Sequence, residues 1–395
     1  MTSKQLVGIC APVLLFALVI GTGTTSAHRP VTSKYTFHQN ILPLFQFYCG
    51  GCHAPGRIAP MSLLRYDEAY PWAESIKEHL LADTMHPWHD DERYGTFSHG
   101  QRMSPRELDM IVDWAGGGTP EGTDALFAPN TENDQRWQLG EPDLILKMDH
   151  GESIGAYEIE KTVNLSLTPG SESAQWLAAF DVRPGNPGIL HDVVLYVIPD
   201  RDEISSAPSP VVDLPADEIL GTWIPGQVRS FTGPDAAYEI QAGARIGARL
   251  HYRKTWRDEG TETADQSELG LYFIKQKVEQ PVRSLVFRKR VVSEHTRQDT
   301  ILVSQPLARE IKLHSVLPQM SRKGRSVRIY VENAEGQRTD LLRVGRFDAA
   351  WPIQYEFADP VVLSRGSRLA ISGLYEPLEE KSGEHRLAIW VGYTL

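Results

Sequence analysis

Residues 189–198 read Ile-Leu-His-Asp-Val-Val-Leu-Tyr-Val-Ile, and this is one of the clearest of several short runs that predict β-strands. The runs recur from residue 143 onward and are separated by turns that contain glycine or proline. Spaced strands over a region of this length favour two β-sandwiches, 143–281 and 282–395, over one large sheet. The other clear runs are Arg245–Tyr252, Leu269–Lys275, Ser326–Val331, Arg368–Leu374 and His385–Val391.

The composition is that of a globular protein. Of 395 residues, 41% are hydrophobic and 23% are charged, which excludes a disordered chain and a polytopic membrane protein. The 32 glycines and 26 prolines favour turn-rich β structure. A formal net charge of −11 argues against a nucleic-acid partner.

Residues 1–27 have the pattern of a secretory signal peptide. Lys4 precedes an apolar stretch, Leu6–Ile20, and Thr25-Ser26-Ala27 offers small residues for cleavage. An uncleaved membrane anchor is the alternative, but the stretch is short for a span of about 20 residues. We therefore expect a periplasmic or otherwise exported protein whose mature form keeps two cysteines, Cys49 and Cys52.

Residues 28–120 are predicted to form a helical domain, and 121–142 a polar linker. Helical spacing covers Phe37–Tyr48 and Glu68–Leu81. Ser104-Pro105-Arg106-Glu107 predicts the start of a third helix that ends before Gly116-Gly117-Gly118. The fold class we expect is multidomain α + all-β, with a helical domain followed by two tandem antiparallel sandwiches of jelly-roll type.

The strongest chemical motif is Cys49-Gly50-Gly51-Cys52-His53. The C-x-x-C-H pattern attaches c-type haem covalently through two thioethers, and the histidine is an axial ligand of the iron. A thioredoxin-like pair would need a βαβ setting, and a zinc site would need further cysteines. The motif therefore predicts one covalent haem c.

The sixth ligand of the iron is predicted to be Met85. It begins Met85-His86-Pro87-Trp88, which cannot be regular helix because of Pro87 and so can pass over the haem face. A thioether ligand raises the reduction potential and suits electron transfer. The remaining candidates before the third helix are Met61, His79, His86, His89, His99 and Met103.

Residues 49–120 resemble small cytochrome domains with the order C-x-x-C-H, A-P-M-x-L, M-P-P-W and W-x-x-x-G-x-P. The counterparts are Ala59–Leu63, Met85–Trp88 with His86 in place of a proline, and Trp114–Pro120. In such domains the methionine of the third motif is the distal ligand, which implies Met85.

Residues 143–395 are similar to copper type II, ascorbate-dependent monooxygenases, the family of the peptidylglycine α-hydroxylating enzyme. The resemblance follows, in order, Arg183–Asn186, Trp223–Gly226, Leu250–Tyr252, Pro318–Gly324 and Trp351–Tyr355. It implies paired sandwiches with a copper site in each.

The copper ligands that this resemblance implies are largely missing. The first site would keep His191 and His251, with Asp192 in place of a histidine. The second site has Gln319 and Ser321 where the family has histidines. Amide and hydroxyl groups are poor substitutes for imidazole, and Arg249 and Arg253 share a strand face with His251. Two-copper oxygen chemistry is therefore not expected.

Three hypotheses follow from these motifs. The first is an electron-carrying cytochrome whose degenerate β module docks a redox partner protein or an assembly. The second is an oxidoreductase in which the haem supplies electrons to a metal at His191, Asp192 and His251. The third is a structural subunit of a membrane-associated assembly. The substrate, if there is one, is not encoded in any motif.

Overall fold

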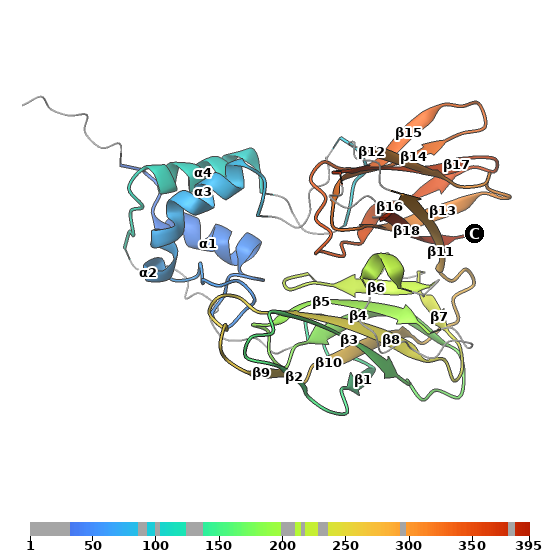
Figure 1. Ribbon diagram of the computed structural model, residues 1–395, viewed down its shortest axis with the longest axis horizontal. Coiled ribbons are helices and arrows are strands. Elements are labelled where there is room, and N and C mark those ends of the chain that lie inside the picture. The colour runs from blue at the N-terminus through green and yellow to red at the C-terminus, as the bar shows by residue number, and fades with distance from the viewer. Residues whose placement is uncertain are drawn as a thin grey trace, which may run out of the picture.

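The chain folds mostly into antiparallel β-sheets, with a few short helices near its N-terminus (Figure 1). The predicted signal peptide, residues 1–27, and residues 124–136 of the predicted linker lie outside the described residues. The computed structural model describes residues 32–85, 93–98, 103–123, 137–198, 210–214, 218–227, 236–292, 298–377 and 384–395.

The N-terminal helices are shorter and more irregular than helical spacing predicts. Two prolines, Pro43 and Pro71, lie inside the predicted helices and lack the amide hydrogen that an uninterrupted α-helix needs. The first run consists of the π-helix η1 (Phe37–Ile41), α1 (Leu42–Leu44) and the π-helix η2 (Phe45–Cys49). The second consists of α2 (Tyr66–Ala69), the 3-10 helix η3 (Tyr70–Trp72) and α3 (Ala73–Leu81).

The third predicted helix, α4 (Pro105–Gly116), begins as predicted. The Ser104 hydroxyl accepts a hydrogen bond from the Glu107 amide, and the Glu107 carboxylate accepts one from the Ser104 amide, which completes a capping box. In the described part of the chain, none of the helices is both long and apolar enough to span a bilayer. The helices pack around a core that includes Phe37, Ile41, Phe45, Leu63, Ile76, Ile111 and Trp114.

The first sandwich consists of two four-stranded sheets and a short ribbon. One sheet has the order β1 (Leu144–Lys147), β10 (Glu268–Ile274), β4 (Gln175–Arg183), β7 (Tyr238–Ile240). The other has the order β3 (Glu160–Leu167), β8 (Ile246–Arg253), β5 (Leu190–Val197), β6 (Ile219–Trp223). The ribbon pairs β2 (Glu152–Ile154) with β9 (Thr263–Asp265), and the 3-10 helix η4 (Val211–Asp213) follows β5.

The second sandwich repeats this arrangement. One sheet has the order β11 (Arg283–Val292), β18 (Glu384–Thr394), β13 (Ile311–Met320), β16 (Tyr355–Leu363). The other has the order β12 (Gln298–Val303), β17 (Arg368–Tyr375), β14 (Gly324–Glu332), β15 (Arg338–Val344). The paired strands within both sheets are antiparallel.

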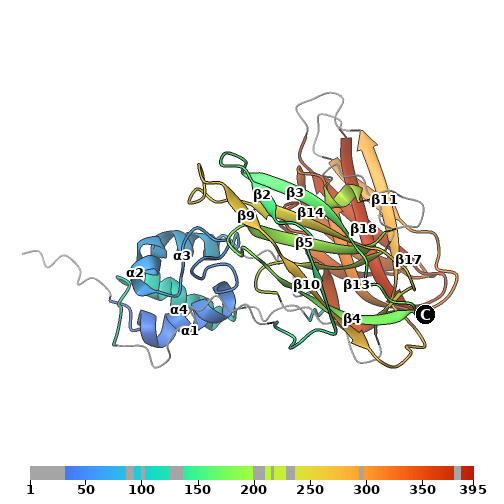
Figure 2. The same cartoon turned by 90° about the horizontal axis from the view of Figure 1, so that it is seen from below.

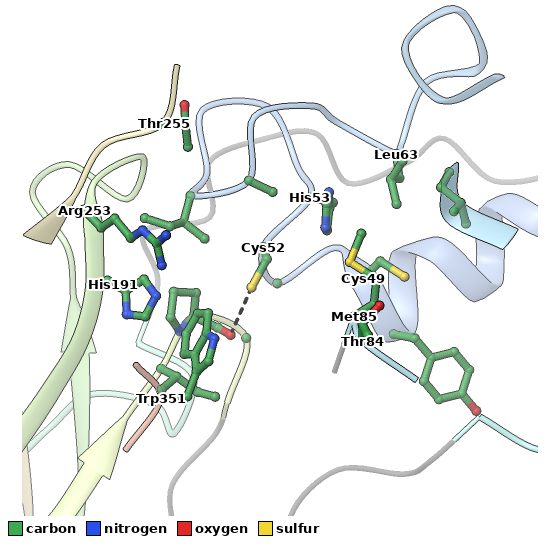
Figure 3. A pocket seen from close by; sticks show the side chains of 18 of the residues that line it. Cys49, Cys52, His53, Leu63, Thr84, Met85, His191, Arg253, Thr255 and Trp351 are labelled. Carbon is green, nitrogen blue, oxygen red and sulfur yellow. Dashed lines mark hydrogen bonds between the residues drawn. The ribbon is translucent and has the colours of Figure 1, made fainter. Parts of the chain in front are cut away.

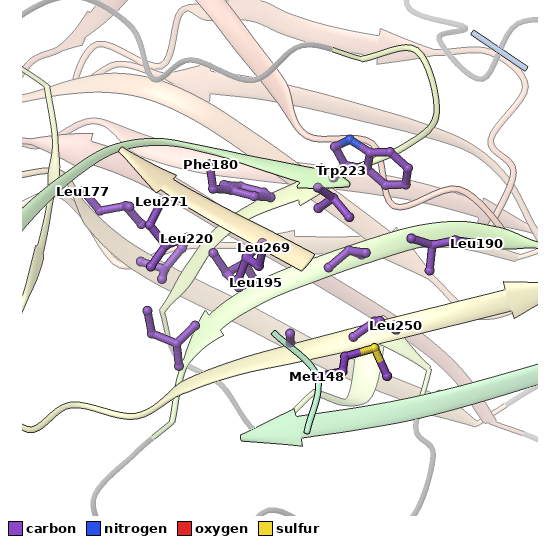
Figure 4. Packing of buried hydrophobic residues seen from close by; sticks show 14 of the residues in the cluster. Met148, Leu177, Phe180, Leu190, Leu195, Leu220, Trp223, Leu250, Leu269 and Leu271 are labelled. Carbon is purple, nitrogen blue, oxygen red and sulfur yellow. The ribbon is translucent and has the colours of Figure 1, made fainter. Parts of the chain in front are cut away.

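Strand β5, which comes from the run quoted first, is buried on both faces. Leu195 and its neighbours on one face pack into the core of the first sandwich, where Figure 4 shows Leu195 close to Leu269. Val194 and Tyr196 on the other face pack against Trp390 of the second sandwich. The nearly continuous apolar sequence is needed because the strand lies between two cores.

The helical part lies at one end of the paired sandwiches and contacts both (Figures 1 and 2). Residues 93–98, which precede α4, leave the helices and join the second sandwich. There Phe97 forms an antiparallel bridge with Phe357 of β16. The helical part and the sandwiches together enclose the cavity described next.

Candidate functional site

A cavity of about 580 Å³ lies where the helical part meets the two sandwiches (Figure 3). The volume is in the range of small-molecule and cofactor sites, about 300–1,000 Å³. Cys49, Cys52, His53 and Met85 line it from the helical part. The opposite wall comes from both sandwiches and includes His191, Ile224, Pro225, Gly226, Arg253 and Trp351. The structure thus brings the predicted haem motif and one residue of the predicted copper site to a single cavity.

His53 is oriented by the backbone that follows it. The turn after η2 is held by hydrogen bonds that the Cys52 and His53 amides donate to the Cys49 carbonyl, at 3.1 and 2.8 Å. The Nδ1–H group of His53 donates to the Met61 carbonyl at 3.2 Å. Burial lowers the pKa of His53, although the hydrogen bond to Met61 opposes this. The ring is therefore neutral, with the Nε2 lone pair free to act as a ligand.

Both thiols of the motif are held in the protonated form. Burial, followed by the charge of the neighbouring Cys52, raises the pKa of Cys49 to about 12. Burial also raises the pKa of Cys52 to about 11, against the lowering effect of Arg57. The two cysteines are not joined by a disulfide. Their thiolate population at neutral pH is consequently very small.

The loop that carries the motif rests directly on the first sandwich. A Cβ atom on Gly51 would lie 2.5 Å from the Cα atom of Gly226, in the turn after β6, so only glycine fits there. Gly226 has a φ of +81°, which glycine adopts readily. The Sγ atom of Cys52 lies 3.7 Å from the Pro225 carbonyl oxygen. Both segments carry motifs of their own, but neither motif indicates a contact between them.

Of the methionines and histidines proposed as sixth ligand, Met85 lines the cavity. Met61 is buried in the helical core and Met103 packs beside it. His79 is at the surface, where its Nδ1 atom lies 2.7 Å from the Thr84 hydroxyl. His86, His89 and His99 lie outside the described residues, together with the rest of the Met85–Trp88 motif.

His191, Asp192 and His251 form a compact cluster behind the cavity wall. Consecutive residues of a regular strand would point to opposite faces, but the β5–β8 register shifts between Leu190 and Asp192. This bulge places His191 beside Asp192. The Nδ1–H groups of His191 and His251 donate to Oδ2 of Asp192 at 2.9 and 2.7 Å. One ligand atom from each residue lies within 4.8 Å of the others.

The charge of Asp192 is balanced inside the protein. Arg249 donates to its Oδ1 atom at 3.1 Å, whereas Arg253 pairs with Glu160 at 3.5 Å. Burial alone would raise the pKa of Asp192. The hydrogen bonds from His191 and His251 and the charge of Arg249 outweigh it and hold the pKa well below its usual range.

The cluster and the cavity are connected through His191. Its ring stacks on Trp351 of the second sandwich, with ring centroids 3.8 Å apart and an interplanar angle of 28°. His191 is 2% exposed, and its Nε2 atom has no hydrogen-bond partner among the described residues. Nδ1 is engaged with Asp192, so Nε2 is the ring nitrogen that faces no partner in the described part of the chain.

The region expected to hold a second copper site is filled by the protein's own contacts. The Gln319 amide donates to the Pro318 carbonyl at 2.8 Å, and the Ser321 hydroxyl accepts from the Arg386 amide at 3.1 Å. Met320 is buried in the core of the second sandwich. Among the described residues, His191, Asp192 and His251 are the one group with the spacing of a metal site.

No protein-family model matches the sequence, and no curated protein matches it. Among solved structures, the chain is similar to the major capsid protein P2 from Bacteriophage PM2, at 12% identity over 60% of this chain and 97% of that chain, with a TM-score of 0.25. It is also similar to a recombinant peptide:N-glycanase F, at 10% identity over 63% of this chain and 95% of that chain, with a TM-score of 0.29. At such TM-scores these likenesses carry no argument about family or function.

Proposed function

We propose that the chain is an exported c-type cytochrome that binds one haem and transfers electrons. The observation that carries this proposal is the C-x-x-C-H motif facing a cavity of cofactor size, with His53 held in the tautomer that leaves Nε2 free. Cys49 and Cys52 would hold the haem through thioethers, and His53 and Met85 would be the axial ligands. Bound there, a haem would supply a one-electron iron couple.

The residues around the motif support this use. The cavity walls on the helical side include Ile58, Leu63, Ile76 and Leu80, whose apolar side chains exclude water. Exclusion of water and a thioether ligand both raise the potential at which a haem iron is reduced. Met85 would supply the thioether. A chain of this kind exchanges electrons with redox partner proteins.

We assign the β module to docking or assembly rather than to oxygen chemistry. Both sandwiches have the same strand order, in which the first strand pairs with the last, and this supports the expected jelly-roll type. Gln319 and Ser321 are engaged in contacts of their own, which supports the loss of the second metal site.

The test is a visible spectrum and an iron measurement on the exported full chain. We expect one iron per chain and a c-type spectrum that remains after denaturation, because thioethers survive it. Replacing both Cys49 and Cys52 by alanine should release the haem, and His53→Ala should change its ligation. His79→Ala is the matched control, since His79 lies at the surface. A colourless wild-type chain would exclude the proposal.

A second candidate function is favoured by the bulge in β5. It brings His191, Asp192 and His251 within ligand distance of one another, and two imidazoles with a carboxylate suit copper, which can accept an electron. The chain would then be an oxidoreductase in which the haem supplies electrons to that metal. Stoichiometric copper that is lost in His251→Ala would support this function. Iron as the only metal of the wild-type chain would remove it.

A further inference from the structure

The haem-motif loop is anchored to the first sandwich at two glycines. Gly51 contacts Gly226 backbone to backbone, and Cys52 lies against the Pro225 carbonyl. A Cβ atom on Gly188, in the loop before β5, would lie 3.3 Å from the Gly56 carbonyl oxygen, so this glycine also supports the loop. The segment that carries the two thiols and His53 is therefore seated on the first sandwich along its length.

Residues 93–98 provide a separate anchor on the second sandwich. The Ser98 amide donates to the Glu356 carbonyl, and the Ala358 amide donates to the Thr96 carbonyl, both at 2.8 Å. The Phe97 ring packs on Phe357 and Tyr355, with ring centroids 5.0 and 5.5 Å away. This segment thus behaves as an added strand at β16.

The two anchors lie on either side of Met85 in the chain. His53 belongs to the anchored loop, between Gly51 and Gly56, and Phe97 comes twelve residues after Met85. From these contacts we infer that the two sandwiches act as a clamp on the helical part: Gly226 positions His53 and the thiols, and Phe97 positions Met85. The inference rests on the proposed function for its haem measurements. It gives the two sandwiches a role, the positioning of the helical part, that needs no metal of their own.

The first experiment tests the Gly226 anchor without haem. The full chain is prepared without haem, and the rate at which iodoacetamide labels Cys49 and Cys52 is measured. Gly226→Ala places a Cβ atom 2.8 Å from the Cα atom of Gly51 and should raise the rate about tenfold through local opening. Gly243→Ala is the matched control, because Gly243 has a similar φ of +71° and nothing within 4 Å of its Cβ position. The Gly243→Ala variant should be labelled at the same rate as wild type.

The second experiment tests the Phe97 anchor in the haem-loaded chain. Phe97→Ala should weaken or abolish the far-red methionine-to-iron band and lower the reduction potential, while the haem stays attached. Phe347→Ala is the matched control, since Phe347 is also half-buried against the same core but lies outside the bridge. If Phe97→Ala does not fold, Phe97→Leu keeps an apolar side chain while losing the ring contacts, and it should show a smaller shift in the same direction.

Two results would overturn the clamp. One is labelling of Gly226→Ala at the rate of wild type and of Gly243→Ala. The other is an unchanged band and potential in a folded Phe97 variant. A wild-type chain that carries no haem would instead refute the proposed function. The labelling rates would still test the Gly226 anchor, because they are measured without haem.

Discussion

The guanidinium of Arg249 lies 3.1 Å from Oδ1 of Asp192, while the two imidazoles of His191 and His251 share Oδ2 of the same carboxylate. Arg249 and Asp192 are both buried, so each charge depends on the other. The arrangement stabilises the bulge in β5 and leaves Asp192 with donors on both oxygens. A metal bound by Asp192 together with the Nδ1 atom of either histidine would have to displace the hydrogen that this nitrogen shares with Asp192.

Replacing Asp192 by alanine should destabilise the chain strongly. It removes the carboxylate that faces the buried Arg249 guanidinium, and breaking a buried ion pair costs about 3–5 kcal/mol. Urea unfolding at pH 7 measures the change. Glu376→Gln is the control, because its partner Arg325 is exposed at the surface and should lose little. Equal losses in both variants would contradict the dependence on burial.

The same carboxylate should contribute to acid unfolding. Its pKa is depressed in the folded chain, so its stabilising effect is present above the ordinary aspartate pKa and is lost as pH falls toward the folded value. Wild type should therefore lose stability below pH about 4 more steeply than Asp192→Asn does. Unfolding free energies between pH 2 and pH 6 test this, and parallel curves would contradict it.

Glu218 should make the folded chain less stable as pH rises, opposite to the effect of Asp192. Burial raises its pKa to about 7, although Arg283 opposes the shift. The folded chain binds this proton more tightly than the unfolded chain, so stability falls as pH rises from about 4.5 to 7. Glu218→Gln, which stays neutral, should be unchanged at pH 4 and more stable than wild type at pH 8. No gain at pH 8 would contradict the raised pKa.

Met85→Ala should keep the haem attached but remove the far-red methionine-to-iron band and lower the potential, because iron loses its thioether ligand. Spectra and a redox titration measure both effects. Met61→Leu, at a buried methionine of similar volume, should keep the band. Loss of the band in Met61→Leu with survival in Met85→Ala would reverse the assignment.

The Cys49 and Cys52 thiols of the haem-free chain should ionise only at high pH. Because burial raises the pKa of Cys49 to about 12 and of Cys52 to about 11, alkylation should keep accelerating with pH beyond 10. In denaturant the rate should level off near the ordinary cysteine pKa of about 8.5. Rates that level off at the same pH in both conditions would contradict the burial effect.

Local sequence patterns predicted the strands and the start of α4 well, because these depend on nearby residues. The apolar run of β5 and the Ser104–Glu107 cap are examples. The resemblance to copper monooxygenases pointed to His191, Asp192 and His251, and the bulge explains how two consecutive residues reach one point. Strand periodicity carries no signal for a bulge.

The contact between Gly51 and Gly226 could not be predicted, because it joins segments that are distant in the sequence and depends on how the helical part is placed on the sandwich. The same holds for Trp351, which reaches His191 from the second sandwich. An aromatic residue near a proline is common in turns, and nothing in its neighbours indicates a stacking partner.

Strand β18 pairs with both β11 and β13, so the last strand of the chain occupies an interior position of its sheet. That sheet is incomplete until residues 384–394 pair with β11 and β13, which come much earlier in the sequence. Contacts of such long sequence separation form slowly. The face of β5 that carries Val194 and Tyr196 therefore stays uncovered until Trp390 has joined its sheet.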